Sequence, residues 1–167
     1  MRINNFDFEY SCAVIGHHDY EFKAATYYYL KLEFEFLIIK CQVDKFYLCG
    51  QNKFCDTALI VLKDLKRGFN QIEIYFVDNG PKFSSKKVKF EHEKAILEQG
   101  YDSIIWLDPV YDNCSPIVLR NNKVIDNCLY VVFYCIPERL NSDTRTCYQY
   151  AIDNNRRCAN VFWDGHK

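Results

Sequence analysis

Ten residues have the chemistry to bind a phosphorylated ligand, and they fall in four groups along the chain. Histidine and arginine can direct positive charge at an anion, and hydroxyl or backbone N–H groups at a helix start can hold a phosphate. A carboxylate can accept hydrogen bonds from ribose. The candidates are Gly16, His17, His18, Gly50, Gln51, Asp56, Arg120, Asn121, Ser142 and Thr144. Together these residue types point to a pocket for a nucleotide.

Each group also has a purely structural interpretation. Gly16 either relieves a tight turn or lets a phosphate approach the backbone. Ser142 either caps a helix or helps to hold a phosphate. Arg120 is the most informative candidate, because it has apolar neighbours on both sides and arginine in such surroundings usually has a fixed anionic partner. That partner is either a ligand phosphate or a carboxylate, for instance Asp108 or Asp126.

The elements that must position these residues alternate along the chain. Short apolar or β-branched runs predict strands, and apolar residues recurring at helical spacing predict helices between them. The expected strands are 11–17, 45–49, 71–77, 103–107, 129–136 and 158–163. The expected helices are 21–40, 53–66, 90–98, 116–127 and 143–155. Residues 78–81 predict a turn, and the lysine-rich residues 82–89 predict a loop.

This alternation predicts an α/β fold. Helical crossovers require parallel strands, so we expect a three-layer Rossmann-like sandwich with a mainly parallel central sheet of about six strands. The expected strand order is 3-2-1-4-5-6. We expect a single domain over residues 1–167, with its core at 11–163. The strand at 11–17 is then central, and the polar residues that follow the strands, Asp108 included, meet at one edge of the sheet.

Composition and charge argue against several classes of protein. The 167 residues are 49% hydrophobic and 26% charged, which is typical of a globular domain. A net charge of -1 argues against a non-specific nucleic-acid binder, which needs a basic surface. No uncharged apolar run approaches the roughly 20 residues of a membrane helix, and residues 1–10 do not resemble a signal peptide. We therefore expect a cytoplasmic protein with no membrane or nucleic-acid partner.

The cysteines predict neither disulfides nor a metal site. The chain has nine of them, an odd number, and no Cys-x-x-Cys pair. Most lie inside apolar runs, as Cys12, Cys49, Cys128 and Cys135 do. Zinc sites need ligands at paired short spacing, so we expect no metal and no required cofactor. The cysteines are interpreted as reduced, buried residues that act as small apolar side chains.

The candidate groups resemble the motifs of one family. An apolar strand ending in T-G-H-R, a strand ending in G-G-A-x-G-F-D, a helix with R-N-x-x-M-[ILV]-D and a helix start with S-G-G-T are typical of the YpsA-like branch of the SLOG superfamily. The matching segments here, in the same order, are 12–18, 46–56, 120–126 and 141–144. On these segments the chain resembles a divergent member of that branch over nearly its whole length.

The resemblance implies a Rossmann-like domain that binds a nucleotide or an ADP-ribose-like molecule, in some branches as a sensor in stress or antiphage signalling. Several positions depart from the motifs, and the second motif keeps its first glycine, Gly50, and its aspartate, Asp56, but loses its other glycines. The arginine of the first motif is His18 here, and a glycine of the last motif is Asp143. The catalytic glutamate of the related Lonely Guy phosphoribohydrolases corresponds to Cys147. Whether the chain is an enzyme is therefore left open.

Two alternatives stand beside ligand binding. The chain could hydrolyse the N-glycosidic bond of a nucleotide, with Asp56 or Asp126 in place of the missing glutamate. It could instead be an interaction protein whose ancestral pocket has decayed. The aromatic residues 27–29 could then mark a face that pairs two copies of the chain in a homo-oligomer, although packing of some of these residues in the core is the favoured interpretation.

Overall fold

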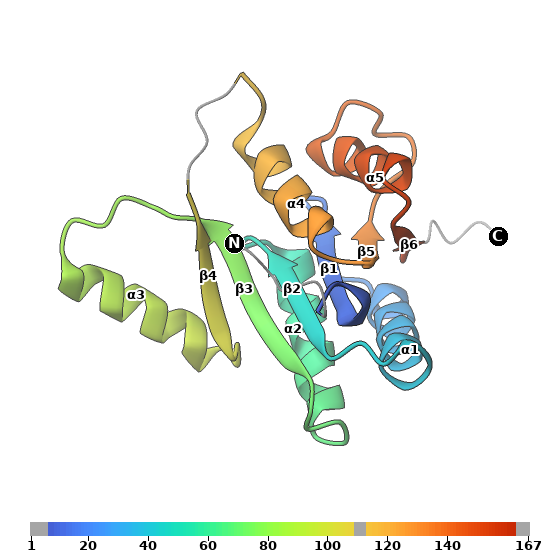
Figure 1. The fold of residues 1–167 in the computed structure, drawn as a ribbon, viewed down its shortest axis with the longest axis horizontal. Coiled ribbons are helices and arrows are strands. Elements are labelled where there is room, and N and C mark those ends of the chain that lie inside the picture. Colours follow the sequence, from blue (N-terminus) through green and yellow to red (C-terminus); the bar gives the residue numbers. More distant parts are fainter. Residues whose placement is uncertain (1–6, 109–112, 163–167) are drawn as a thin grey trace.

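The computed structural model describes residues 7–108 and 113–162, which form one six-stranded parallel sheet with helices on both faces (Figure 1). The strands are β1 (Ser11–Gly16), β2 (Lys45–Cys49), β3 (Glu73–Asn79), β4 (Ser103–Leu107), β5 (Tyr130–Tyr134) and β6 (Arg157–Asn160). The helices are α1 (Ala24–Cys41), α2 (Lys53–Lys66), α3 (Lys86–Glu98), α4 (Pro116–Asp126) and α5 (Asp143–Asp153). The expected α/β class, with its Rossmann-like parallel sheet, is confirmed. Part of the expected loop 110–115 and the end of the expected strand 158–163 lie outside the described residues.

The strands are arranged in the order β4-β3-β2-β1-β5-β6, with β1 in the interior of the sheet as expected. The expected order 3-2-1-4-5-6 differs from the structure in the position of the fourth strand. β4 pairs with β3 at the outer edge, and β5 takes the place beside β1. Burial gives the reason, because all five residues of β5 are buried whereas only Leu107 is buried in β4. A strand that is apolar on both faces suits the interior, and a half-exposed strand suits an edge.

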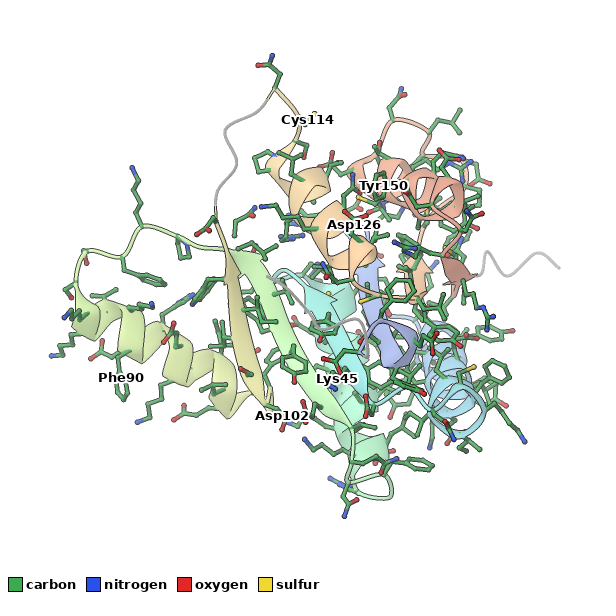
Figure 2. The ribbon with its side chains drawn as sticks, in the orientation of Figure 1. Lys45, Phe90, Asp102, Cys114, Asp126 and Tyr150 are labelled. Carbon is green, nitrogen blue, oxygen red and sulfur yellow. The ribbon has the colours of Figure 1, made fainter. Side chains whose placement is uncertain are left out.

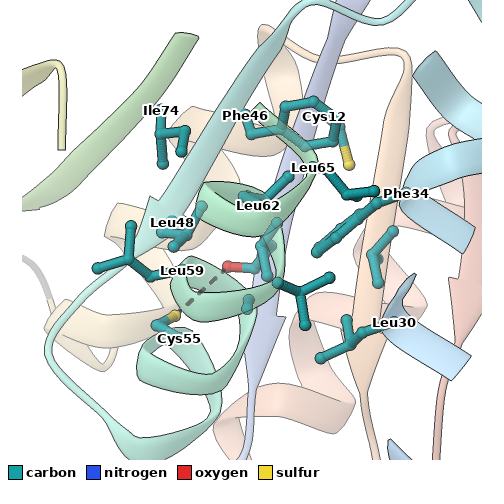
Figure 3. Packing of buried hydrophobic residues seen from close by; sticks show 14 of the residues in the cluster. Cys12, Leu30, Phe34, Phe46, Leu48, Cys55, Leu59, Leu62, Leu65 and Ile74 are labelled. Carbon is teal, nitrogen blue, oxygen red and sulfur yellow. Dashed lines mark hydrogen bonds between the residues drawn. The ribbon is translucent and has the colours of Figure 1, made fainter. Parts of the chain in front are cut away.

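β1 contributes to two separate cores, which explains its uninterrupted apolar run. Cys12 and Val14 belong to the core formed with α1 and α2, where Phe34 packs toward the sheet (Figure 3). Ala13 and Ile15 belong to the core formed with α4 and α5 on the other face. Successive side chains of a strand point to opposite faces, so both faces of β1 are covered by helices.

The direction in which the chain moves across the sheet reverses beside β1. From β1 the chain passes through α1, α2 and α3 to β2, β3 and β4, and then crosses back through α4 to β5. β5 pairs directly with β1 on the side opposite β2. In open parallel sheets a ligand crevice forms at the carboxyl ends of the strands where the order reverses. The fold therefore has its natural binding position at the ends of β1 and β5.

β3 continues two residues past the expected strand end at 77. Asp78 and Asn79 extend the parallel ladder, because they pair in register with Trp106 and Leu107 of β4. The turn expected at 78–81 is therefore wrong for Asp78 and Asn79, and the segment from Gly80 to the start of α3 is irregular. This shift brings the Asp78 carboxylate to the carboxyl end of the sheet.

α3 begins at Lys86, inside the segment 82–89 that was expected to be a loop. The Ser85 hydroxyl accepts a hydrogen bond from the Val88 N–H at 3.2 Å and caps the helix. Three lysine–glutamate pairs at i,i+4 spacing then follow along its exposed surface, which stabilises a helix with few buried residues. A helix that is stabilised by a serine cap and by surface ion pairs, with few buried residues, has no apolar pattern that would distinguish it from a lysine-rich loop.

The cysteines are free thiols, as expected, and six of the nine are buried. The buried ones include Cys12, Cys49, Cys128 and Cys135, which confirms their interpretation as small apolar residues. Burial raises the pKa of Cys55 to about 12, so that thiol stays protonated and unreactive at neutral pH. No cluster of histidine, cysteine and carboxylate side chains suited to a metal ion is present in residues 7–108 and 113–162.

α1 is rich in apolar residues on its outer side as well as its inner side. Its exposed row is Tyr28, Leu32, Phe36 and Ile39, each at least 44% exposed. Of the aromatic residues expected at a pairing face, Tyr28 and Tyr29 are exposed, whereas Tyr27 packs against the core. No helix in the part of the chain that the structure describes has both the length and the apolar character needed to cross a membrane.

Burial along α2 predicts that alanine substitutions at two nearby aliphatic residues lower the free energy of unfolding by very different amounts. Leu62 is fully buried in the core with α1, so Leu62→Ala should lower the free energy of unfolding by about 3 kcal/mol. Ile60 lies on the same helix but is 58% exposed, so Ile60→Ala should change it by about 0.5 kcal/mol or less. Urea unfolding followed by circular dichroism measures both. Equal losses in the two variants would contradict the orientation of α2.

Candidate functional site

A pocket of about 450 Å³ opens at the carboxyl ends of the central strands, and we call it the edge pocket. Its lining comes from the segments that follow β1, β2 and β5, from the end of β3, and from α4 and the start of α5. The lining residues are Gly16, His17, His18, Asp19, Gly50, Gln51, Asn52, Asp78, Ile117, Arg120, Asn121, Arg139, Ser142, Asp143 and Thr144. The pocket lies where the strand order reverses, as the fold class leads one to expect.

Nine of the ten candidate residues line the edge pocket, and Asp56 is the exception. Asp56 is the fourth residue of α2, where it is exposed and makes no wall of the pocket. The sequence motif predicts Asp56 in the pocket because its spacing from Gly50 matches the family pattern. In the structure, α2 begins at Lys53, and its helical path carries that position out of the pocket.

Arg120 is the buried cation of the site, and only 10% of its side chain is exposed. Its Nη1 donates to Asp78 Oδ1 at 2.8 Å, and its Nε donates to Asn121 Oδ1 at 3.1 Å. Its Nη2 donates to the Cys49 carbonyl at 3.4 Å. The structural partner is therefore Asp78 at the end of β3, rather than Asp108 or Asp126.

Gly50 is required because the Arg120 guanidinium occupies the space beside its Cα. Gly50 has a φ of +84°, a conformation that favours glycine. A Cβ at this position would lie 2.6 Å from Arg120 Nη1. The tight turn after β2 and the position of the buried arginine therefore depend on each other.

Gly16 has a packing role. A Cβ on Gly16 would lie 2.3 Å from Phe54 Cδ1, so the Phe54 ring of α2 packs directly against the glycine backbone. Phe54 is fully buried and also contacts the rings of Tyr20 and Tyr134. Close packing of α2 on β1 is thus the physical reason for a glycine at this strand end.

The His17 imidazole is buried, and its Nε2 accepts a hydrogen bond from the Ile136 N–H at 2.7 Å. This bond joins the end of β1 to the segment after β5. Burial, and then the charge of Arg139, lowers the pKa of His17 from its ordinary value of 6.5. His17 is therefore a neutral acceptor that shapes the pocket, whereas the adjacent His18 is exposed at its mouth.

Two helices begin at the edge pocket, and both have side-chain caps. Asn52 accepts a hydrogen bond from the Cys55 N–H at 2.9 Å at the start of α2. Ser142 accepts one from the Arg145 N–H at 3.1 Å at the start of α5. Capping is thus a role of Ser142 in the structure, and the positive ends of both helix dipoles still point toward the pocket.

The edge pocket has charged side chains of both signs. Arg139 forms an ion pair with Asp19 at the mouth, and Asp143 Oδ2 accepts a hydrogen bond from the Ser115 hydroxyl at 3.1 Å. The pair with Arg139 lowers the pKa of Asp19, so this carboxylate stays charged. The pocket can therefore donate to phosphate oxygens and accept from hydroxyl groups at the same time.

Sequence reasoning missed Asp78 and Arg139, and it misplaced Asp108. The signal for Asp78 was present, because it directly follows the apolar run of the third expected strand. Asp108 follows β4, which lies at the outer edge of the sheet, so it lines a separate cavity with Lys123 and Asp126. Arg139 gave no signal, because it lies in an irregular segment after β5.

The fold and the pocket define a Rossmann-like α/β protein with a polar cavity where its strand order reverses. No protein-family model and no curated protein matches the chain. The likeness to the SLOG superfamily therefore stays a hypothesis that rests on the motif residues.

The contact between Gly50 and Arg120 predicts that adding one methyl group at position 50 destabilises the protein strongly. Gly50→Ala should lower the free energy of unfolding by about 2 kcal/mol, because it adds both backbone strain and a clash with the guanidinium. Gly68→Ala is the matched control, since a Cβ there meets only the Leu65 carbonyl oxygen at 3.9 Å. Its effect should stay within about 0.5 kcal/mol. Denaturant unfolding of both variants measures the difference, and similar losses would refute it.

The buried, neutral His17 predicts a pH-dependent stability. Its folded-state pKa lies below 6.5, so its contribution is fully present above pH 6.5 and is lost as the pH falls toward the folded-state value. His17→Phe removes both the acceptor and the titration, so its unfolding free energy should be lower at pH 7.5 and should fall less between pH 7.5 and 5.5. Ile60→Ala, which removes an exposed side chain and no titratable group, is the control and should keep the wild-type slope. Parallel slopes for His17→Phe and the wild type would contradict this role.

Proposed function

We propose that the protein binds a nucleotide or a nucleotide-derived small molecule, such as an ADP-ribose-like compound, in the edge pocket. The observation that carries this proposal is the convergence of two arginines and two helix starts at the point of strand-order reversal. Open parallel sheets bind nucleotides at that point. The motif resemblance to the YpsA-like branch of the SLOG superfamily supports the same class of ligand.

Arg139 and the start of α5 are the best candidates to bind phosphate. Arg139 Nη1 donates to Asp19, and its other N–H groups have no partner in the described part of the chain, so they are free for an anion. The Thr144 hydroxyl lines the pocket and likewise makes no hydrogen bond to the described residues. The positive end of the α5 dipole lies beside it and adds to the attraction.

The carboxylates of the pocket favour a ligand that also carries hydroxyl groups. Asp19, Asp78 and Asp143 line the pocket, so its three acidic side chains outnumber its two arginines. An ionised phosphate group alone offers few donors to these carboxylates. Ribose hydroxyls can donate to carboxylate oxygens, and a nucleotide has both ribose and phosphate. The charge balance therefore supports a nucleotide over an inorganic anion.

The hydrolase alternative gains no support from the pocket. Asp56 and Asp126, the carboxylates considered in place of the missing glutamate, are not among its lining residues. Asp126 accepts a hydrogen bond from the Tyr150 hydroxyl at 2.7 Å on the outer side of α4 and α5 (Figure 2). Cys147 is fully buried, and burial raises its pKa to about 11. We therefore propose ligand binding without nucleotide hydrolysis.

The decayed-pocket alternative is also less well supported. A volume of about 450 Å³ stays open between the lining side chains, whereas a decayed pocket would be filled by them. A cytoplasmic ligand sensor in stress or antiphage signalling is the form of the proposal that the resemblance implies. It requires no metal or other cofactor, and its partner is the nucleotide-type ligand itself.

Arg139 provides the sharpest test of the proposed function. Arg139→Gln should weaken binding of a ribonucleoside 5′-monophosphate about tenfold, because one charged hydrogen bond to phosphate is lost. The Arg139 side chain is 42% exposed and lies outside the hydrophobic core, so the variant should fold normally. Arg67→Gln, on a residue 85% exposed at the far end of α2, is the control and should bind like the wild type. Isothermal titration calorimetry measures both.

The proposed function has a clear negative result. If none of the four ribonucleoside 5′-monophosphates and no ADP-ribose binds to the wild type, the edge pocket is not a nucleotide site. If Arg139→Gln and Arg67→Gln bind equally well, the phosphate does not lie at Arg139.

A further inference from the structure

A second cavity, of about 400 Å³, lies beside the edge pocket, and we call it the aromatic cavity. Gln51 and Asp78 line both cavities, so the two are contiguous. The remaining walls of the aromatic cavity come from the end of β3, the segment before α3, the first turns of α3 and β4. Its position lies on the β3–β4 side of the edge pocket, away from β5.

Three rings from separate segments meet in this cavity. Trp106 of β4 and His92 of α3 lie with their ring planes 22° apart and their centroids 6.0 Å apart. Phe83, from the segment before α3, lies 5.6 Å from His92 and 5.8 Å from Trp106, centroid to centroid. Trp106 Nε1 donates to Glu93 Oε1 at 2.7 Å, which holds the indole in a fixed orientation. The cavity thus has a preformed aromatic wall.

The hydrophobic core alone does not account for this arrangement. α3 buries only Ile96 and projects from the edge of the sheet beside β4 (Figure 1). Val88 lines the cavity on the same helix and is 43% exposed. Side chains of this kind leave apolar surface open to a ligand next to a polar pocket, which is the usual composition of a small-molecule site.

We propose that the aromatic cavity binds the base of the nucleotide whose ribose and phosphate occupy the edge pocket. This inference rests on the proposed function. A nucleobase is a flat ring that stacks on aromatic side chains, and such stacking tolerates any of the four bases. The cavity is lined by four rings, those of Phe76, Phe83, His92 and Trp106, whereas the edge pocket supplies charged and polar groups. The two halves therefore match the two halves of a nucleotide.

Polar groups at the boundary can read the edge of the base. The Gln51 side-chain amide makes no hydrogen bond within the described residues, although it lines both cavities. Asn79 donates from its Nδ2 to the Pro116 carbonyl at 3.2 Å, which leaves its Oδ1 available as an acceptor. An amide can pair with the donor and acceptor edge of a base. Gln51 thus joins the base-binding and ribose-binding parts of the site.

The test compares ligands with and without a base. The four ribonucleoside 5′-monophosphates, each titrated separately, should include at least one that binds the wild type about tenfold more tightly than ribose 5-phosphate. Phe83→Ala should remove this advantage and leave the affinity for ribose 5-phosphate within about twofold. Phe83→Tyr keeps the ring and should retain the advantage. Calorimetry gives all of these affinities.

Phe90→Ala is the matched control on α3. Phe90 is 66% exposed, does not line the cavity, and points away from the body of the protein (Figure 2). This variant should bind every ligand as the wild type does. Circular dichroism of the Phe83 and Phe90 variants should be the same as that of the wild type, since neither residue is part of the core.

A fluorescence measurement reports on the cavity directly. The chain has two tryptophans, so Trp163→Phe leaves Trp106 as the only indole. In that background a bound monophosphate should change the emission of Trp106, and ribose 5-phosphate at saturation should not. Equal changes with both ligands would count against a base at this wall.

The outcomes separate this inference from the proposed function. Equal binding of the monophosphates and ribose 5-phosphate to the wild type would overturn the base site and leave the phosphate and ribose site standing. Equal affinities for Phe83→Ala and Phe90→Ala would also overturn the base site. If none of these ligands and no ADP-ribose binds to the wild type, the proposed function fails and the base site fails with it.

Discussion

The guanidinium of Arg120 is the constraint around which the site is built. A charge with so little contact with water is stable only when its N–H groups are paired. Asp78, Asn121 and the Cys49 carbonyl supply these partners, and they come from the end of β3, from α4 and from the end of β2. One side chain therefore holds three elements at fixed distances. The pocket keeps its shape because moving any of these elements would leave the buried charge without a partner.

The sequence was sufficient for the elements with strong patterns. The apolar run of β1 follows from burial on both faces, and the polar residues after β1, β2 and β5 converge because parallel strands end at one edge. The sequence was not sufficient where contacts between distant segments determine the structure. Asp78 looked like part of a turn, and only its ladder with β4 makes it a strand residue. Asp56 matched a motif by spacing, yet the helical path of α2 carries it away from the pocket.

The proposed site has two parts with different physical origins. The edge pocket follows from the fold, because any sheet with this strand order opens a crevice there. The aromatic cavity depends on a local addition, since β4 and α3 extend the sheet beyond β3 and bring Phe83, His92 and Trp106 together. These rings come from three different segments and form no recognisable motif, so their meeting could not be inferred from the sequence. The edge pocket, which the fold class provides, thus has the aromatic cavity beside it because β4 and α3 are present.

The close approach of Arg120 to Gly50 also limits how this chain can change over evolutionary time. The arginine occupies the volume that any side chain at position 50 would need. A larger residue at position 50 is therefore less costly once the arginine has been lost, and an arginine at position 120 fits best while position 50 is glycine. In an alignment of sequences descended from this chain, positions 50 and 120 should vary together, although one follows β2 and the other lies in α4. A covariation signal between them would reflect simple exclusion of volume.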